Sequence, residues 1–431
     1  SRFAREDIYL AAVTLAIVVL AFRFVRRPTT VTLTVLFALC SVSFAIKESG
    51  LVSVGLIAIF FAGAAVVQGI QATGRGERFR DGEVMRAVTA VGWVGWAYAV
   101  AALLLTYALL FTFFFINTTC VTSAFKGSPK HETSCLNAVF YGLDYWRAQQ
   151  DVARGGDSAW LYGSIIFGEE WPALLLAAVG IVFALLRPTT LRLFLIWIFV
   201  TTLAFYCWGS ERFAWLTVHP LVPMILLAGV GLQGLWELRS RVARTVAFVV
   251  VGLGAAYMVA ASYSANAVHH SDPESLLVST QSSTQVNDIV AQVRSLIRGA
   301  KAEGKPPPGI TIDSSSGATF PYAWYFRDDA VGYVDMTLDG YVPDQPVLIM
   351  TLEGREKLKP TLAAYEGRRF DFRIWWVKDY KKKFSFDAWK NWFLHRRAWN
   401  PTGGMPEWLY VRRDLGSPGK ETKSAIPDLL K

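Results

Sequence analysis

The sequence predicts a helical membrane protein that crosses the bilayer several times and carries an α/β domain at its C-terminal end. The chain has 431 residues, 53% of them hydrophobic, and the apolar residues gather in runs of about 18 or more, the length that crosses a bilayer. Lysines and arginines gather in short segments between these runs, as in loops that face the cytoplasm. After residue 264, short strand and helix patterns alternate, which is typical of an α/β domain.

We expect about eight membrane spans, of which the fourth is long enough for a strong tilt or an overhang. They cover residues 8–22, 30–46, 51–70, 87–116, 171–186, 191–206, 220–235 and 245–263. The expected domains are a transmembrane domain at 1–263, a soluble α/β domain at 264–415 and a flexible tail at 416–431, where apolar periodicity is lost. A polar outer loop at 117–170 contains a run at 145–151 whose spacing predicts an amphipathic helix lying on the membrane.

The positive-inside rule gives these spans an orientation. Four arginine-rich segments, at 23–27, 75–86, 187–192 and 239–244, alternate with the other loops and should all be cytoplasmic. The segments 1–7, 47–48, 117–170 and 207–219 and the C-terminal domain then lie outside the cytoplasm. The net charge of +9 is explained by the cytoplasmic loops, so we expect a lipid bilayer and no nucleic acid as partner.

Charged residues gather at the predicted outer membrane edge and are candidates for chemistry. Charges beside an apolar run are costly in hydrocarbon, so they lie at a membrane edge or face a polar cavity. Lysine or arginine could hold a lipid-linked phosphate, and a carboxylate could act as a base or a metal ligand. Each charge could equally anchor a helix end at the interface. The candidates are Arg2, Arg5, Glu6, Asp7, Lys47, Glu48, Arg154, Glu211, Arg212 and His219.

The four cysteines do not have the spacing of a zinc site. Cys40 and Cys207 lie within or at the end of apolar runs and are expected to be packing residues. Cys120 and Cys135 flank one polar loop, and they form a candidate disulfide if that loop faces an oxidising compartment.

The C-terminal domain is expected to contain a small, mostly parallel sheet. Strands are predicted at 310–313, 331–334, 347–351, 370–377 and 408–411, with helices at 281–300, 318–326, 354–365 and 386–395. No Gly-x-Gly-x-x-Gly follows any of these strands, which excludes a dinucleotide site of that type. The aromatic residues between Phe320 and Phe326 either line a sugar or acceptor groove or belong to a core helix, and the core helix is the favoured interpretation.

Several motifs, taken in order, resemble those of the GT-C superfamily of membrane glycosyltransferases. Ser1–Asp7 leads into a span, and Lys47-Glu48 follows a later one. Three further stretches carry the resemblance: Tyr145–Gly156, Glu211–Gly229 and Tyr322–Asp328. The set resembles family 39, the dolichyl-phosphate-mannose protein mannosyltransferases, and within it the archaeal and bacterial flippase-activity-associated group. The resemblance extends to about Arg413.

This resemblance implies an integral plasma membrane enzyme of a bacterium or archaeon. It would transfer a sugar, such as the hexose mannose, from a polyprenyl-phosphate carrier to a protein, lipid or polysaccharide acceptor on the extracytoplasmic face. Glu6 and Asp7 would be catalytic, the other candidates would contact the donor, and a divalent metal ion is the one cofactor to consider. In this superfamily the main acidic residue lies in the first outer loop. Because the chain does not begin with methionine, we expect it to be N-terminally truncated after that loop and therefore to lack this main catalytic acidic residue.

Two other classes of function remain open at the level of sequence. A flippase or transporter for lipid-linked sugars would also need outward-facing charges, but it should carry polar residues along a path through the membrane. The predicted spans contain almost none. A non-catalytic accessory protein could instead use the C-terminal domain to recruit other envelope enzymes.

Overall fold

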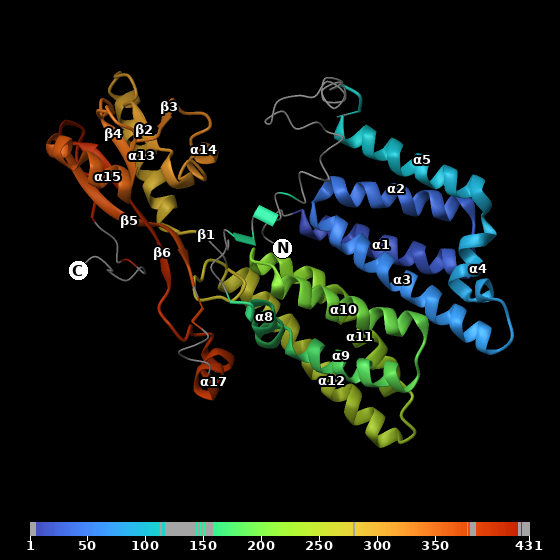
Figure 1. Cartoon of the computed structure of the whole chain (residues 1–431). Helices are drawn as coiled ribbons and strands as arrows, with labels where there is room; N and C mark the ends of the chain where they lie inside the picture. The colour runs from blue at the N-terminus through green and yellow to red at the C-terminus, as the bar shows by residue number, and fades with distance from the viewer. Residues whose placement is uncertain are drawn as a thin grey trace. The chain divides into compact units, whose positions relative to one another are not determined.

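The computed structural model describes residues 6–112, 114–116, 144, 147–148, 150–151, 158–278, 281–376, 378–379, 385–420 and 424. The chain forms two compact units, Ser1–Asn266 and Ala267–Lys431. The first is helical and the second contains a sheet (Figure 1).

The first half of the helical unit consists of long antiparallel helices. They are α1 (Asp7–Arg26), α2 (Thr30–Ile46), α3 (Ser49–Gly74), the short α4 (Glu83–Ala90) and α5 (Gly92–Phe111), with a 3-10 turn η1 (Phe79–Asp81) before α4. Thr29 begins α2 as an N-cap, because its side chain accepts a hydrogen bond from the Thr32 amide.

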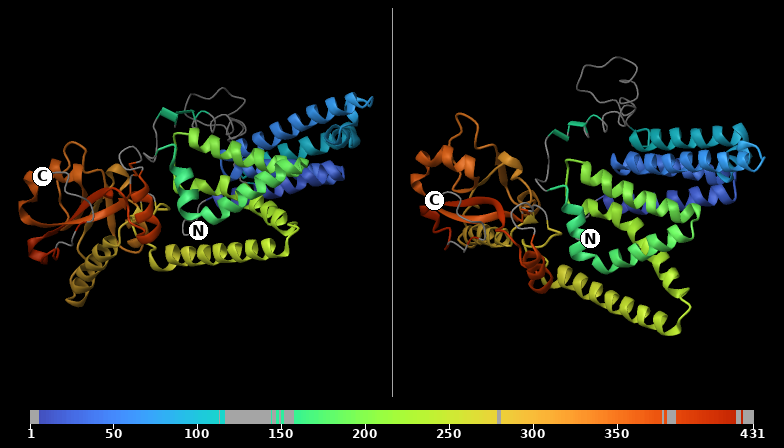
Figure 2. Two further views of the ribbon diagram at one scale, coloured as in Figure 1. Left: turned by 90° about the horizontal axis from the view of Figure 1, so that it is seen from below. Right: turned by 60° about the horizontal axis from the view of Figure 1, so that its bottom comes forward.

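The second half contains α8 (Leu161–Glu169), α9 (Trp171–Leu186), α10 (Thr190–Trp208), η3 (Ala214–Thr217), α11 (Val218–Trp236), α12 (Arg241–Tyr263) and η4 (Ser264–Val268). Helices α9 and α11 pack closely because each presents a glycine to the other's backbone. A Cβ atom at Gly180 would overlap the Leu227 carbonyl oxygen, and one at Gly231 would overlap the Leu176 carbonyl oxygen. Helix α12 lies at the periphery of the unit (Figure 2).

Length and composition support a membrane protein. Among the described residues, six helices are long and apolar enough to cross a membrane, and the bent pair α8–α9 would make a seventh. The predicted second span, α2, has 17 residues and is shorter than these six. The apolar core between α1, α3, α10 and α11 contains Ile17, Ile57, Phe194 and Leu227.

The fourth predicted span has a different form in the structure, whereas the fifth has its predicted bounds as α9 but follows an additional helix. The fourth, expected at 87–116, is divided: α4 ends at Ala90 and α5 begins at Gly92, which adopts a left-handed φ of 61° that interrupts a helix. The fifth is preceded by α8, and the two helices meet at 101° around Glu170.

The C-terminal unit contains a mixed six-stranded sheet in the order β1-β5-β6-β4-β2-β3. Its strands are β1 (Gln281–Ser282), β2 (Ile310–Asp313), β3 (Val331–Val334), β4 (Val347–Thr351), β5 (Tyr365–Trp375) and β6 (Gly403–Arg412). The β2–β3 and β2–β4 pairs are parallel, whereas the β1–β5, β5–β6 and β4–β6 pairs are antiparallel. The expectation of a mostly parallel sheet was therefore wrong, because β5 and β6 form a long hairpin-like pair rather than a second β-α-β crossover.

Helices cover both faces of this sheet. On one face, α13 (Gln285–Ala302) and α14 (Tyr322–Tyr325) pack against alternate strand residues such as Ile312 and Ile349. On the other face, α15 (Leu352–Leu358) and η6 (Lys359–Ala364) cover Leu348 and Met350. The alternation along β4 places neighbours on opposite faces, as the period of two in a strand requires. The helix α17 (Phe386–His395) and the turns η5 (Ser315–Gly317) and η7 (Arg413–Leu415) complete the unit.

Two predicted C-terminal helices are shorter than expected. The helix expected at 318–326 is reduced to α14, because Gly317 adopts a left-handed φ of 70° and Pro321 stands immediately before the helix. The helix expected at 354–365 is divided between α15 and η6, with Pro360 at the second position of η6.

Candidate functional site

Three helix ends meet at one end of the helical unit and bring charged residues together. Asp7 is the first residue of α1, Lys47 follows the last residue of α2, and His219 lies in the first turn of α11. A carboxylate at a helix N-terminus and an ammonium at a C-terminus each complement the helix dipole. Local helix structure therefore favours both charges where they lie, before any contact between them is counted.

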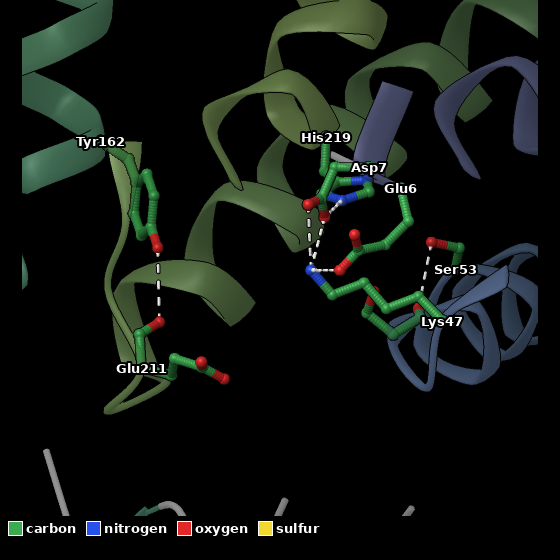
Figure 3. A network of polar contacts seen from close by, with 8 residues as sticks. Glu6, Asp7, Lys47, Ser53, Tyr162, Glu211 and His219 are labelled. Carbon is green, nitrogen blue, oxygen red and sulfur yellow. Dashed lines mark hydrogen bonds and ion pairs between the residues drawn. The ribbon is translucent and has the colours of Figure 1, made fainter. Parts of the chain in front are cut away.

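Asp7 lies at the centre of this group (Figure 3). Lys47 Nζ donates to Asp7 Oδ1 at 2.9 Å and to Oδ2 at 3.0 Å. His219 Nε2 lies 3.1 Å from Asp7 Oδ1. Glu6 Oε1 lies 3.6 Å from Lys47 Nζ on the other side. We call these four residues, Glu6, Asp7, Lys47 and His219, the polar cluster.

The two carboxylates of the polar cluster differ in accessibility. The Asp7 side chain is 2% exposed and both of its oxygens accept hydrogen bonds. The Glu6 side chain is 42% exposed and pairs with Lys47. A buried ionised carboxylate requires partners of this kind. Asp7 is therefore built to hold Lys47 and His219 in place, whereas Glu6 is the carboxylate that an external molecule can reach.

His219 is fixed by a residue that the sequence did not single out. The ring of Tyr206, in the last turn of α10, stacks on the imidazole with centroids 5.0 Å apart and planes 6° apart. Tyr206 and His219 are both buried. The sequence signal was weak, since an aromatic residue at the end of a span is common at membrane interfaces.

Two buried hydroxyl groups lie near the polar cluster, at the same end of the helical unit. Ser43 lies one turn before Lys47, and Thr217 lies two residues before His219. Both side chains are buried, and within the described part of the chain neither hydroxyl has a hydrogen-bond partner. Such groups are uncommon in folded proteins and mark places where a polar molecule can be accommodated.

The predicted candidates Glu211 and Arg212 lie in the loop between α10 and α11 and do not join the polar cluster. Tyr162 Oη donates to the Glu211 carbonyl oxygen at 3.5 Å (Figure 3), and Arg212 Nη2 donates to the Cys207 carbonyl oxygen at 3.3 Å. Next to them, the Gln150 side-chain oxygen accepts hydrogen bonds from the Ser210 amide and hydroxyl. Gln150 and Tyr162 were not identified from the sequence.

Other predicted residues are exposed or lie outside the description. Glu48 is exposed, and its side chain makes no hydrogen bond or ion pair with the described residues. Arg2, Arg5, Arg154, Cys120, Cys135 and most of the expected amphipathic helix at 145–151 lie outside the described residues. Cys40 is buried and Cys207 half-buried, and neither forms a disulfide.

A metal ion has no preformed site in the described segments. Their side chains contain no group of three or more histidine, cysteine, aspartate or glutamate residues placed to bind one. In the polar cluster, Lys47 occupies the space between Glu6 and Asp7 where a cation would have to bind. With the Lys47 ammonium between them, the two carboxylates are paired with a cationic side chain and are not placed to hold a divalent ion in this arrangement.

Two adjoining cavities run along α1, α10 and α11. The smaller, of about 40 Å³, is lined by His219, Ser53 and Thr202 among others. The larger, of about 760 Å³, begins at Leu15 and Val18, which both cavities share, and extends toward the far end of α1. A volume of about 40 Å³ beside His219 has room for only a few water molecules.

The aromatic segment of the C-terminal domain contributes mainly to the core. Tyr322 and Phe326 are buried, whereas Phe320 and Trp324 are exposed. Tyr322 Oη donates to Glu407 Oε2 at 2.7 Å. Burial raises the pKa of the Glu407 carboxyl well above its usual range. This pair is an internal polar contact of the fold.

The long apolar helices are those of a helical membrane protein in length and composition, with a C-terminal unit built on a sheet and a polar cluster at one end of the helices in which Asp7 and His219 are buried. Comparisons with protein-family models, with curated proteins and with solved structures found no match.

Proposed function

We propose that the protein is a membrane glycosyltransferase that moves a sugar from a polyprenyl-phosphate carrier to an acceptor outside the cytoplasm. The observation that carries the proposal is the convergence of Glu6, Asp7, Lys47 and His219 at one end of a set of apolar helices. Such an arrangement meets a lipid-anchored substrate where its phosphate and sugar leave the hydrocarbon. The motif resemblance to GT-C enzymes supports the same activity.

Arginines at the opposite end of the helices support the proposed orientation of the protein in the membrane. Helix α1 runs from the polar cluster at Asp7 to the arginines at its C-terminal end. Helix α10 begins after Arg187, and α11 ends before Arg239. Since arginine-rich loops favour the cytoplasm, the polar cluster would face the other side.

In the proposed reaction, an acceptor hydroxyl attacks the anomeric carbon of the donor sugar. The bond between that carbon and the phosphate oxygen breaks, and polyprenyl phosphate leaves with the electron pair. Glu6 accepts the hydroxyl proton, because it is the accessible carboxylate of the cluster. Lys47 lies beside the leaving phosphate, Asp7 holds its ammonium in position, and His219 in turn contacts Asp7. Asp7 thus acts as a positioning residue.

The proposal is tested with purified protein in lipid vesicles, a polyprenyl-phosphate mannose donor and a detergent-soluble acceptor. Released polyprenyl phosphate and labelled acceptor are both measured. Glu6→Gln should lower turnover by about 100-fold or more, as expected for loss of a general base. The matched control is Glu48→Gln, an exposed carboxylate in the neighbouring loop, which should leave turnover unchanged. Equal turnover in Glu6→Gln and wild type would refute the assignment of the base.

Transport of a lipid-linked sugar is the second candidate, and the adjoining cavities are the observation that favours it. Together they extend from His219 toward Arg23 along α1. The narrow part beside His219, however, has a volume of about 40 Å³, too small for a sugar to pass in this state. Movement of labelled donor across the vesicle bilayer without transfer to an acceptor would favour transport over catalysis.

A further inference from the structure

The larger cavity combines apolar walls with a basic rim. Its volume is about 760 Å³, within the range of sites that hold small organic ligands. The walls come from three helices and are mostly aliphatic: Leu15, Val18, Val19 and Phe22 of α1, Leu191 and Leu195 of α10, and Leu226 and Val230 of α11. Several of these side chains are partly exposed although they are large and apolar.

Three arginines form the rim. Arg23, Arg26 and Arg27, at the C-terminal end of α1, line the cavity. All three are exposed, and none of their guanidinium groups makes a hydrogen bond or ion pair with the described residues. Among the residues that the structure describes, no acidic side chain lines the cavity. Glu237, which accepts a hydrogen bond from the lining residue Gln233, is already paired with Arg187. The rim therefore has uncompensated positive charge.

We infer that this cavity is a binding site for an anionic phospholipid. The headgroup phosphate would lie among Arg23, Arg26 and Arg27, and an acyl chain would lie along the aliphatic walls. Guanidinium groups bind phosphate oxygens with two parallel hydrogen bonds, and basic pockets between membrane helices suit anionic lipid headgroups. The inference requires a membrane but does not depend on the proposed transferase activity.

A simpler interpretation accounts for the arginines but leaves the cavity unexplained. Basic residues at the end of a span anchor it and orient it in the membrane, so charge alone would not define a site. The difference lies in the space beside them. Gly229 of α11 lines the cavity, and a Cβ atom added there would contact nothing within 4 Å. A lipid chain can approach α11 at this glycine as closely as the helix backbone allows.

The charge of the rim is tested by titrating the purified full chain in detergent with phosphatidylglycerol or phosphatidylcholine and counting bound lipids by native mass spectrometry. We expect phosphatidylglycerol to bind more tightly. The triple variant Arg23→Gln, Arg26→Gln, Arg27→Gln should weaken that binding by about 100-fold, at about fivefold for each arginine. The matched control, Arg239→Gln, Arg241→Gln, Arg244→Gln, removes the same charge from residues that do not line the cavity and should change binding little.

The contribution of the aliphatic walls to lipid binding is tested by substitutions that leave the charge of the protein unchanged. Gly229→Leu should narrow the cavity beside α11 and weaken phosphatidylglycerol binding by at least tenfold, whereas Gly229→Ala should bind as wild type does. Inorganic phosphate at millimolar concentration should not compete, because it lacks the chain. Equal binding of the two lipids, equal loss in the two triple variants, or full competition by inorganic phosphate would each overturn the inference.

Discussion

Removal of the Lys47 ammonium should destabilise the helical unit strongly, because it leaves a buried carboxylate without its main partner. The Asp7 side chain is 2% exposed and receives two hydrogen bonds from Lys47. Breaking a buried pair from one side costs about 3–5 kcal/mol. The Lys47 side chain is 18% exposed, so some water reaches the site, and we expect about 3 kcal/mol for Lys47→Met.

The free energy of unfolding can be measured by reversible denaturation of the purified protein in mixed detergent micelles. Glu48→Gln is the neighbouring control and should change stability by less than about 0.5 kcal/mol, as is usual for exposed residues. The double variant Asp7→Asn, Lys47→Met removes both charges and should recover much of the loss, because no charge is left buried alone. A Lys47→Met protein as stable as wild type, or strictly additive effects in the double variant, would refute the reasoning.

Two further predictions concern other parts of the chain. Because burial raises the folded-state pKa of Glu407, the folded state holds that proton more tightly, and C-terminal domain stability should fall as pH rises above the carboxyl's usual value of 4.5. Glu407→Gln should flatten this dependence in thermal melts at pH 4.5 and 8, and equal slopes in both proteins would contradict it. Gly180→Leu should destabilise the helical unit by several kcal/mol, because the new side chain would overlap Leu227. Gly163→Leu is the control and should not destabilise it, because Gly163 is at an open position. Similar melting temperatures for the two variants would count against close α9–α11 packing.

The order of helices was predictable because hydrocarbon imposes a simple pattern on sequence. The starts and ends of α2 and α9 match the predicted spans, since polar or charged residues bound each apolar run. The division at Gly92 was missed, because hydropathy is continuous across it and only a backbone angle distinguishes the two helices. Apolar composition therefore predicts that a segment is helical, but not where a glycine interrupts it.

In the C-terminal domain, the positions of several strands were predictable from the sequence, but their pairing was not. Strands β2, β3 and β4 have the predicted bounds, because each is a short apolar run between turn residues. Their partners could not be read in the same way. Alternation of strands and helices favoured parallel pairing, but the long antiparallel pair of β5 and β6 depends on contacts between segments distant in sequence, and nothing local in either strand specifies that choice.

The candidate site was predictable from the sequence in its location but not in its contacts. That Asp7, Lys47 and His219 would lie at the same membrane edge followed from the alternation of loops, although Lys47 and His219 are 40 and 212 residues from Asp7. The contacts between these residues could not be predicted in the same way, because a loop prediction places a residue at one end of a helix without identifying its neighbours. Glu48 and Glu211 satisfied the same rule and lie outside the cluster.

The contacts also change the roles within the site. From sequence, Glu6 and Asp7 were equivalent carboxylates before one helix. In the structure the Asp7 side chain is 2% exposed, whereas that of the adjacent Glu6 is 42% exposed. The reason is that Asp7 begins the helix and faces α2 and α11, while Glu6 precedes it. A group whose oxygens are both occupied can exchange a proton only by breaking the contacts that hold Lys47 and His219. The proposed reaction therefore assigns proton transfer to Glu6 and assigns Asp7 to keep the lysine ammonium in place beside it.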